Sequence, residues 1–219
     1  MLMSPLKIDF VSDIACPWCA VGLASLEQAI ARLGDEVSVS LHFQPFELNP
    51  DMPPEGEDIV EHLMRKYRIT AEQVTQNHDH IRERGAEVGF NFNLEGRQRT
   101  WNTFDAHRLL HWAGEQDDAD AQRRLKWLLL SAYFSEGRNP SSRAVLLAAA
   151  EKAGLDVDEA AAILDADTWR DAVRQQQQFY LSQGIHSVPA VIINDRHLIQ
   201  GGQPPEVFEQ ALRQIAAES

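Results

Sequence analysis

The only two cysteines of this 219-residue chain lie three positions apart, in the segment Cys16-Pro17-Trp18-Cys19. Before this segment, apolar residues recur at every second position over residues 6–10, a pattern typical of a half-buried strand. After it, apolar residues recur at spacings of three and four over residues 23–33, which predicts a helix. The cysteine pair is therefore expected where a strand passes into a helix.

The next pattern predicts a second strand, because apolar residues again alternate over residues 37–43. Helical spacing dominates residues 54–164, where Thr70 to Gln73 has the form of a capping box. Residues 88–94 alternate as well, but they include two Asn and a Gly, so we expect an extended loop there instead of a strand.

Strand patterns return near the end of the chain. A helix is expected over residues 169–180, and strands are expected at 188–193 and 197–199 around a turn at Asn194-Asp195. A last helix is expected to begin at Pro204-Pro205.

Without the helical segment, the element order is strand, helix, strand, helix, strand, strand, helix. This order predicts an α/β thioredoxin fold with a large all-helical insertion between the second strand and the second core helix. The expected boundaries are a first thioredoxin part at 1–53, the insertion at 54–164, and a second thioredoxin part at 165–219. A thioredoxin fold also requires the cysteine pair to begin the first helix and a proline to begin the third strand. Cys16 and Pro189 stand at those places.

Cys16 is the predicted nucleophile of this site. With Pro17 at the first helical position, Cys16 falls near the N-cap, where free backbone N–H groups and the helix dipole favour a thiolate. Cys19 lies one turn later on the inner side, so we expect it to be less exposed and to resolve a mixed disulfide. Asp9 and Asp13 are candidates to accept its proton, although either could instead cap the helix or contact solvent.

A zinc site is the main alternative for the cysteine pair, but it would need two histidine ligands. His78 and His80 are two apart on a helix and are interpreted as surface side chains, whereas His107 and His111 are interpreted as packing or capping groups. No metal is therefore predicted. A structural disulfide is also disfavoured, because so short a loop adds little stability.

Charge and composition narrow the classes of partner. The chain has 33 acidic and 20 basic side chains and a net charge of −13, which disfavours nucleic acid and anionic membrane surfaces as partners. We find no signal-peptide pattern and no long apolar run, so a cytoplasmic protein is expected. Structural disulfides are rare in that compartment, which again favours redox chemistry for the cysteine pair.

Several segments resemble the DsbA-like thioredoxin family, in particular its FrnE-like branch of cytoplasmic oxidoreductases. That branch is related to 2-hydroxychromene-2-carboxylate isomerase and to kappa-class glutathione transferase. The resemblance implies an insertion that covers one side of the dithiol, a cis peptide between Val188 and Pro189, and a place for Asn102 near the active-site cleft. A plain helix cap is the alternative for Asn102. The segments that carry the resemblance are 8–13, 16–19, 45–50, 102–109, 184–189 and 201–204.

The resemblance and the residues together predict a thiol–disulfide oxidoreductase that acts on protein or small-molecule disulfides. The isomerases and transferases generally carry Ser at the position of Cys16, and this chain keeps both cysteines. A glutathione-dependent isomerase or transferase is the alternative, and a non-enzymatic binding or chaperone module is a third. No bound cofactor is expected, although glutathione could serve as co-substrate, and both a monomer and a homodimer stay open. The predicted substrate-binding residues are Pro17, Trp18, Val188, Pro189 and Asn102.

Overall fold

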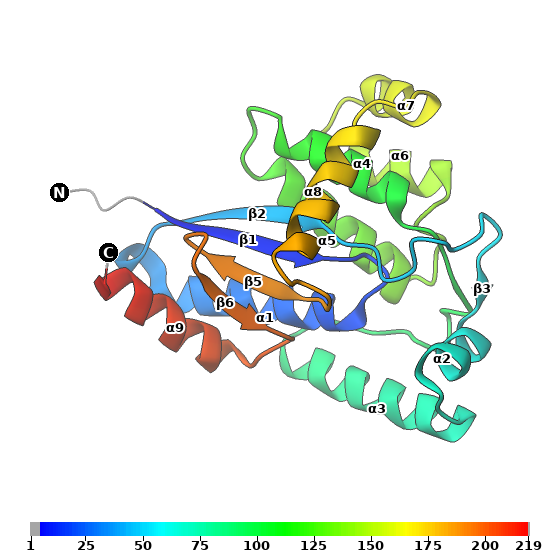
Figure 1. Cartoon of the computed structure of the whole chain (residues 1–219), viewed down its shortest axis with the longest axis horizontal. Helices are drawn as coiled ribbons and strands as arrows, with labels where there is room; N and C mark the ends of the chain where they lie inside the picture. The colour runs from blue at the N-terminus through cyan, green and yellow to red at the C-terminus, as the bar shows by residue number, and fades with distance from the viewer. Residues whose placement is uncertain (1–4, 219) are drawn as a thin grey trace.

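The computed structural model describes residues 5–218 (Figure 1). Residues 1–4 and 219, at the outer ends of the predicted segments 1–53 and 165–219, lie outside the described residues. The central sheet has the strand order β2-β1-β5-β6, in which β1 pairs with β2 in parallel and with β5 antiparallel, and β6 pairs with β5 antiparallel. The strands are β1 (Leu6–Ser12), β2 (Val39–Pro45), β5 (Ala190–Ile193) and β6 (His197–Gln200).

Helices flank both sides of this sheet. Helix α1 connects β1 to β2 through a short 3-10 turn, and it packs against the C-terminal helix α9. In Figure 1, α8 crosses in front of β1 and β2, whereas α1 lies behind β5 and β6. This arrangement confirms the predicted thioredoxin fold. The elements are α1 (Pro17–Leu33), the 3-10 turn (Gly34–Glu36), α8 (Arg170–Ser182) and α9 (Pro205–Glu218).

The long segment between β2 and α8 is mainly helical, as expected. It also contains a two-stranded antiparallel ladder that the sequence patterns did not predict, formed by β3 and β4 with two residues each. Strands this short carry no periodicity to detect. The elements are β3 (Glu57–Asp58), α2 (Ile59–Tyr67), α3 (Ala71–Glu87), β4 (Arg99–Thr100), α4 (Phe104–Gly114), α5 (Ala121–Phe134), α6 (Arg143–Lys152) and α7 (Val157–Asp165).

Local sequence signals determine several of these boundaries. The predicted capping box is present, since Thr70 accepts a hydrogen bond from the Gln73 N–H and the Gln73 side chain accepts one from Thr70. Asn194 and Asp195 both have positive φ, which permits the tight turn between β5 and β6. Residues 88–94 form the expected loop.

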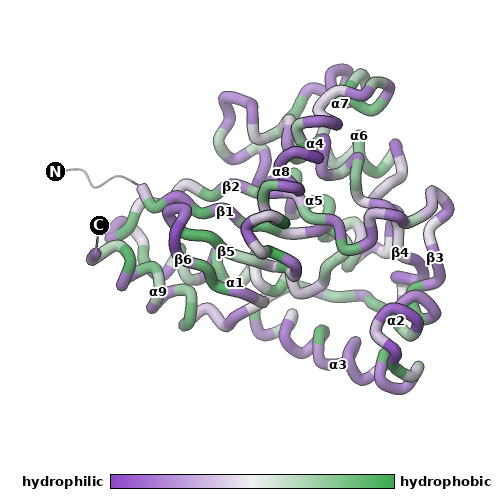
Figure 2. The backbone as a smooth tube through the Cα atoms, viewed as in Figure 1, coloured by the Kyte–Doolittle hydropathy of each residue, from purple (hydrophilic) through white to green (hydrophobic). Residues whose placement is uncertain are grey.

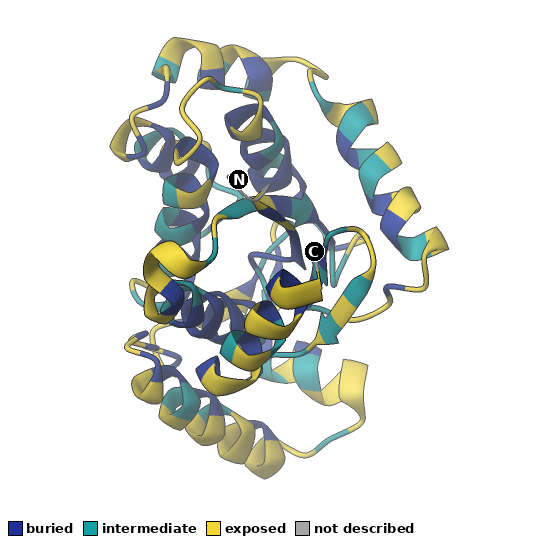
Figure 3. Ribbon diagram, turned by 90° about the vertical axis from the view of Figure 1, so that its left-hand side faces the viewer, coloured by how far each residue is buried: buried dark blue, intermediate teal, exposed yellow. Residues whose placement is uncertain are grey.

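One large hydrophobic cluster joins the sheet to the inserted helices. It contains Ile8 and Phe10 of β1 together with Leu109 of α4 and Leu125 of α5. Figure 2 shows β1 and β5 as mainly hydrophobic and α3 as mainly hydrophilic, and Figure 3 shows the exposed residues on the outer turns of the helices. The boundary of the insertion at 54–164 stays a prediction. Within residues 5–218, no helix combines the length and apolar content needed to span a membrane.

Candidate active site

Cys16 is the N-cap residue of α1, and Pro17 is its first helical residue, as predicted. Cys16 has extended backbone angles, φ −96° and ψ 112°. Its N–H donates to the Asp13 carbonyl at 3.3 Å, and its own carbonyl accepts from the Cys19 N–H at 3.1 Å. The end of β1 and the first turn of α1 therefore position the thiol.

The two thiols differ in what surrounds them. Cys16 is 4% exposed and Cys19 is fully buried, so the predicted order of exposure is confirmed. Cys16 lines a large cavity, and Cys19 does not. Burial raises the pKa of the Cys19 thiol well above its ordinary value, and the hydrogen bond with Cys16 raises it further. Cys19 is therefore held as a neutral thiol behind Cys16.

The loop before β5 lies directly against the dithiol. The Cys16 thiol donates to the Val188 carbonyl with an Sγ–O distance of 3.6 Å, and the peptide bond between Val188 and Pro189 is cis. Gly22 of α1 makes this approach possible, because a Cβ at that position would lie 3.0 Å from Cγ of Pro189. Gly202 also leaves room for α1, because a Cβ at that position would lie 3.1 Å from the carbonyl oxygen of Trp18.

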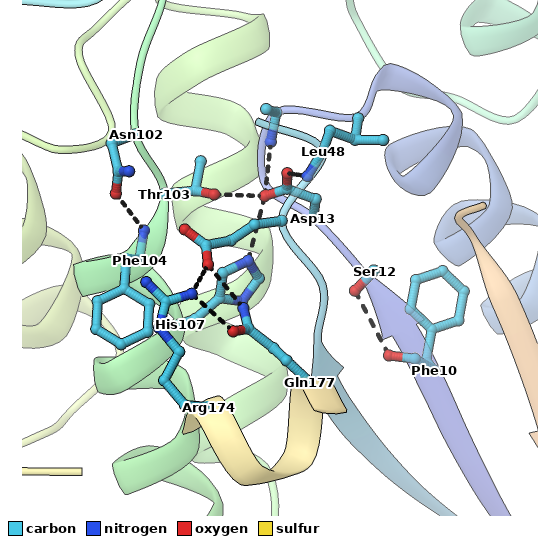
Figure 4. Close-up of polar contacts among 12 residues, drawn as sticks. Phe10, Ser12, Asp13, Leu48, Asn102, Thr103, Phe104, His107, Arg174 and Gln177 are labelled. Carbon is cyan, nitrogen blue, oxygen red and sulfur yellow. Dashed lines mark hydrogen bonds and ion pairs between the residues drawn. The ribbon is translucent and has the colours of Figure 1, made fainter. Parts of the chain in front are cut away.

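Cys16 opens onto a cavity of about 730 Å³ between the start of α1, helices α2 and α3, and the loops at 46–49 and 186–188. Pro17, Trp18 and Val188 of the predicted substrate-binding residues line it, whereas Pro189 and Asn102 do not. The Asn102 side chain instead accepts a hydrogen bond from the Phe104 N–H at 2.8 Å (Figure 4). Asn102 thus bonds to the first N–H of α4, but it lies one residue before Thr103, which is the N-cap.

His78 and His80 both line this cavity, and only His78 departs from the predicted surface position, because His80 is exposed whereas His78 is half-buried. The His80 ring lies 5.4 Å from the Trp18 ring. Burial, followed by the charges of Arg97 and Arg82, lowers the pKa of His78 to about 4. The cavity extends around α3, so residues two apart on this helix can both reach it.

The two histidines of the second pair lie in different surroundings. His111 packs against the Trp169 ring at 4.8 Å, as predicted for a packing residue. His107 is buried, and its Nε2 lies 3.2 Å from Asp13 Oδ1. Among residues 5–218, no group of three or more His, Cys, Asp or Glu side chains is arranged to hold a metal ion.

Asp13 lies beneath the start of α1 at the centre of a buried hydrogen-bond network (Figure 4). It accepts from the Leu48 N–H at 2.7 Å, from the Thr103 hydroxyl at 2.7 Å, and from the Ala15 N–H at 3.3 Å. Burial raises the pKa of this carboxyl, but the hydrogen bond and charge of His107, together with the hydrogen bonds from Leu48 and Thr103, outweigh burial, so the net pKa is lowered.

Asp9, the other acidic candidate, interacts with different residues from those around Asp13. It forms an ion pair with Lys7 at 3.0 Å and accepts a hydrogen bond from Gln44 at 2.6 Å. Of the two predicted acids, Asp13 is therefore the one bound into the turn that carries Cys16.

Lys126 of α5 was not singled out from the sequence. It is 1% exposed, burial lowers its pKa, and its charge interacts with Cys19, Asp13 and Cys16. The sequence held a signal for this residue, because Lys126 shares a helical face with the apolar positions Leu129 and Leu130, three and four residues further on.

Known proteins resemble this chain along most of its length. A model of the DSBA-like thioredoxin domain matches residues 7–213. The chain belongs to this family. The uncharacterized protein YwbO of Bacillus subtilis is 30% identical over 206 residues, which is 94% of each chain. The structure of the probable DsbA oxidoreductase SCO1869 from Streptomyces coelicolor matches with 31% identity and a TM-score of 0.88, over 98% of this chain and 91% of that one.

A more distantly similar structure shows the same fold. The cytosolic disulfide reductase DsbM from Pseudomonas aeruginosa, solved with GSH, is 17% identical to this DsbA-like chain, with a TM-score of 0.64. The match covers 96% of this chain and 99% of that one.

Proposed function

We propose that this DsbA-like protein is a thiol–disulfide oxidoreductase that uses Cys16 as nucleophile and Cys19 as resolving thiol. The observation that carries the proposal is the asymmetry of the two thiols. Cys16 lines a large cavity at the start of a helix, whereas Cys19 lies fully buried one turn behind it. Similarity to the Streptomyces oxidoreductase, over nearly the whole chain, supports the same reaction class.

In the proposed reaction, the Cys16 thiolate attacks one sulfur of a substrate disulfide and forms a mixed disulfide, while the other substrate sulfur leaves as a thiolate. Cys19 then attacks the Cys16 sulfur, the second substrate thiolate leaves, and the Cys16–Cys19 disulfide forms. Cys19 must lose its proton first, because its pKa is raised. Asp9 pairs with Lys7 and the lowered pKa of Asp13 makes its carboxylate a weak base, so a role for either as the acceptor stays a prediction.

The residues around Cys16 would position the substrate. Pro17 and Trp18 line the cavity beside the thiol, and the backbone of Val188 and Pro189 faces it across the cleft. A role for Asn102 in substrate binding stays a prediction. We also propose the FrnE-like branch and a cytoplasmic location, for which the lone cysteine pair and the cytosolic relative DsbM are the support. The oligomeric state, monomer or homodimer, stays open.

A glutathione-dependent isomerase or transferase is the second candidate. The cavity favours it, because a volume of about 730 Å³ falls in the range for small-molecule sites. The solved complex of DsbM with GSH is a further reason to test glutathione as a co-substrate.

A variant of the resolving cysteine separates these functions. We expect Cys19→Ser to lose disulfide reductase turnover by at least about 100-fold, because the mixed disulfide has no intramolecular exit. Turnover of a small disulfide with a chemical reductant measures this. An isomerase or transferase would keep its activity in Cys19→Ser but not in Cys16→Ala. Activity that survives Cys16→Ala would instead support a binding or chaperone module and contradict the proposal.

A further inference from the structure

Arg97, in the loop before β4, is a buried cation that has no anionic partner among the described residues. It is 4% exposed, it lines the cavity that contains Cys16, and its Nε has no hydrogen-bond partner in the same part of the chain. Its Nη2 lies 3.3 Å from Nε2 of His78, and the Tyr133 hydroxyl is a second polar neighbour. The guanidinium also stacks 5.4 Å from the Tyr133 ring and 5.2 Å from the Phe134 ring.

No carboxylate pairs with this guanidinium among residues 5–218. Arg97 also borders a smaller cavity, but the carboxylates there are engaged elsewhere. Asp79 and Glu95 pair with Arg82, and Asp58 caps α2. A buried charge is expensive unless it is paired, and Arg presents a planar fork of donors suited to a carboxylate.

Other charged residues in the cavity also favour an anionic ligand such as a carboxylate. Lys66 of α2 also lines the cavity, and its Nζ bonds to the Leu48 carbonyl and the Asn49 side chain, at 2.6 Å each. Glu47 is the one carboxylate among the described lining residues, and Arg174 pairs with it from α8. In a chain with a net charge of −13, this cavity therefore carries an excess of positive charge.

The positive groups and the nucleophile share one enclosed space. Arg97 and Lys66 both lie close enough to Cys16 to interact with its charge. Apolar side chains of α2 and α3, among them Leu63 and Val74, complete the wall. A volume of about 730 Å³ suits a small molecule better than a folded protein surface.

We propose that this cavity is a binding site for a low-molecular-weight disulfide that carries a carboxylate, with the carboxylate held by Arg97 and the disulfide presented to Cys16. This inference rests on the proposed oxidoreductase function and names its substrate class. Overall, the reduced dithiol transfers two electrons to the disulfide R–S–S–R. The S–S bond between Cys16 and Cys19 forms, the S–S bond of the substrate breaks, and two R–SH are released with the two protons of the dithiol.

The test is single-turnover oxidation of the reduced protein by three small disulfides. These are the dicarboxylate 3,3′-dithiodipropionate, the neutral bis(2-hydroxyethyl) disulfide and the cationic cystamine. We expect Arg97→Gln to lower the second-order rate constant for the dicarboxylate about tenfold, because a charge-assisted pair is lost. The rate constant for the neutral disulfide should change less than about twofold, and Arg97→Lys should restore part of the preference.

Arg99→Gln is the matched control. Arg99 is exposed, lies two positions away and does not line the cavity, so its loss should change none of the three rates. Lys66→Gln is a second variant in case Arg97→Gln does not fold, and it should also weaken the preference for the dicarboxylate.

The proposal is overturned if Arg97→Gln and Lys66→Gln leave the dicarboxylate rate unchanged, or if the rates for all three disulfides fall together. A wild-type protein that none of the three oxidises would instead contradict the proposed oxidoreductase function.

Discussion

Cys16 and Cys19 lie one helical turn apart, but the protein treats them differently. Cys16 donates a hydrogen bond to the Val188 carbonyl and lines a cavity, whereas Cys19 is fully buried. Burial raises the pKa of Cys19, so this thiol is protected from reacting before a mixed disulfide forms beside it. In the proposed reaction, this difference in placement would order the two steps of exchange.

Asp13 gives a pH-dependent prediction at the residue scale. Its pKa is lower in the folded state than the ordinary value of about 3.9, so the unfolded chain takes up this proton first as the pH falls. The stabilisation is therefore complete above about pH 5 and is lost as the pH falls through the folded-state pKa. We expect Asp13→Asn to lower the free energy of unfolding by about 3 kcal/mol at pH 7, and by less near pH 3.

Urea unfolding of both proteins at several pH values measures this difference. Thr103→Val is a useful companion, because it removes one donor to Asp13 and leaves the carboxylate in place. A difference between wild type and Asp13→Asn that does not change with pH would show that the charge of Asp13 is unimportant for stability.

The positions of Cys16 and Pro17 in the helix could be predicted because they depend only on the neighbouring residues in the sequence. The N-cap place of Cys16 and the first helical place of Pro17 follow from the chain sequence alone. The contact between His107 and Asp13 spans 94 positions, and it exists only because α4 packs against β2, which pairs with β1. The place of Arg97 in the cavity likewise depends on how its loop packs on α5, which no local pattern encodes.

At the scale of elements, the active site depends on the close approach of α1 to the loops at 188–189 and 201–203. The Gly201 N–H donates to the Pro189 carbonyl at 2.8 Å and holds these two loops together. Gly22 leaves room for Pro189, and Gly202 leaves room for the first turn of α1. Small residues on both sides therefore set the position of Val188 above Cys16.

Gly22→Val tests this packing. A side chain at Gly22 meets Pro189, so we expect a loss of about 1–3 kcal/mol in the free energy of unfolding. Mixed-disulfide formation should also slow, because Val188 moves relative to Cys16. The control is Ala31→Val in the same helix, where the side chain is exposed. Equal stability and equal rates for the two variants would mean that the approach of Pro189 is not required.

Elements with strong periodicity were predicted well, and short elements were not. The strands β1 and β2 and the helices α1 and α9 follow their apolar repeats. Residues 88–94 alternate like a strand but pair with none, because Phe90 and Phe92 are buried against aromatic side chains of α5. The ladder of β3 and β4 depends on a contact between segments about 40 residues apart, which periodicity does not report.

At the scale of the whole molecule, the inserted helices complete the active site. Helices α2 and α3 form the outer wall of the cavity, and α4 and α5 supply His107 and Lys126 beneath the dithiol. The same hydrophobic cluster runs through the sheet and through α3, α4 and α5. The thioredoxin part and the insertion are therefore expected to fold together.

This shared core predicts a single cooperative unfolding transition. Loss of helical circular dichroism and the change in tryptophan fluorescence should have the same midpoint in urea, since most of the tryptophans lie in the inserted segment and Trp18 lies in α1. Two separated midpoints would show that the insertion at 54–164 is an independent domain.

The central claim is that Cys16 attacks and Cys19 resolves, and the site of the mixed disulfide tests it most directly. Reduced Cys19→Ser and Cys16→Ser proteins are each mixed with one equivalent of 3,3′-dithiodipropionate, quenched with acid and mapped by peptide mass spectrometry. We predict rapid formation of the adduct on Cys16, and formation on Cys19 that is slower by at least about 100-fold, because Cys19 is buried with a raised pKa. Equal or faster formation on Cys19 would contradict the account.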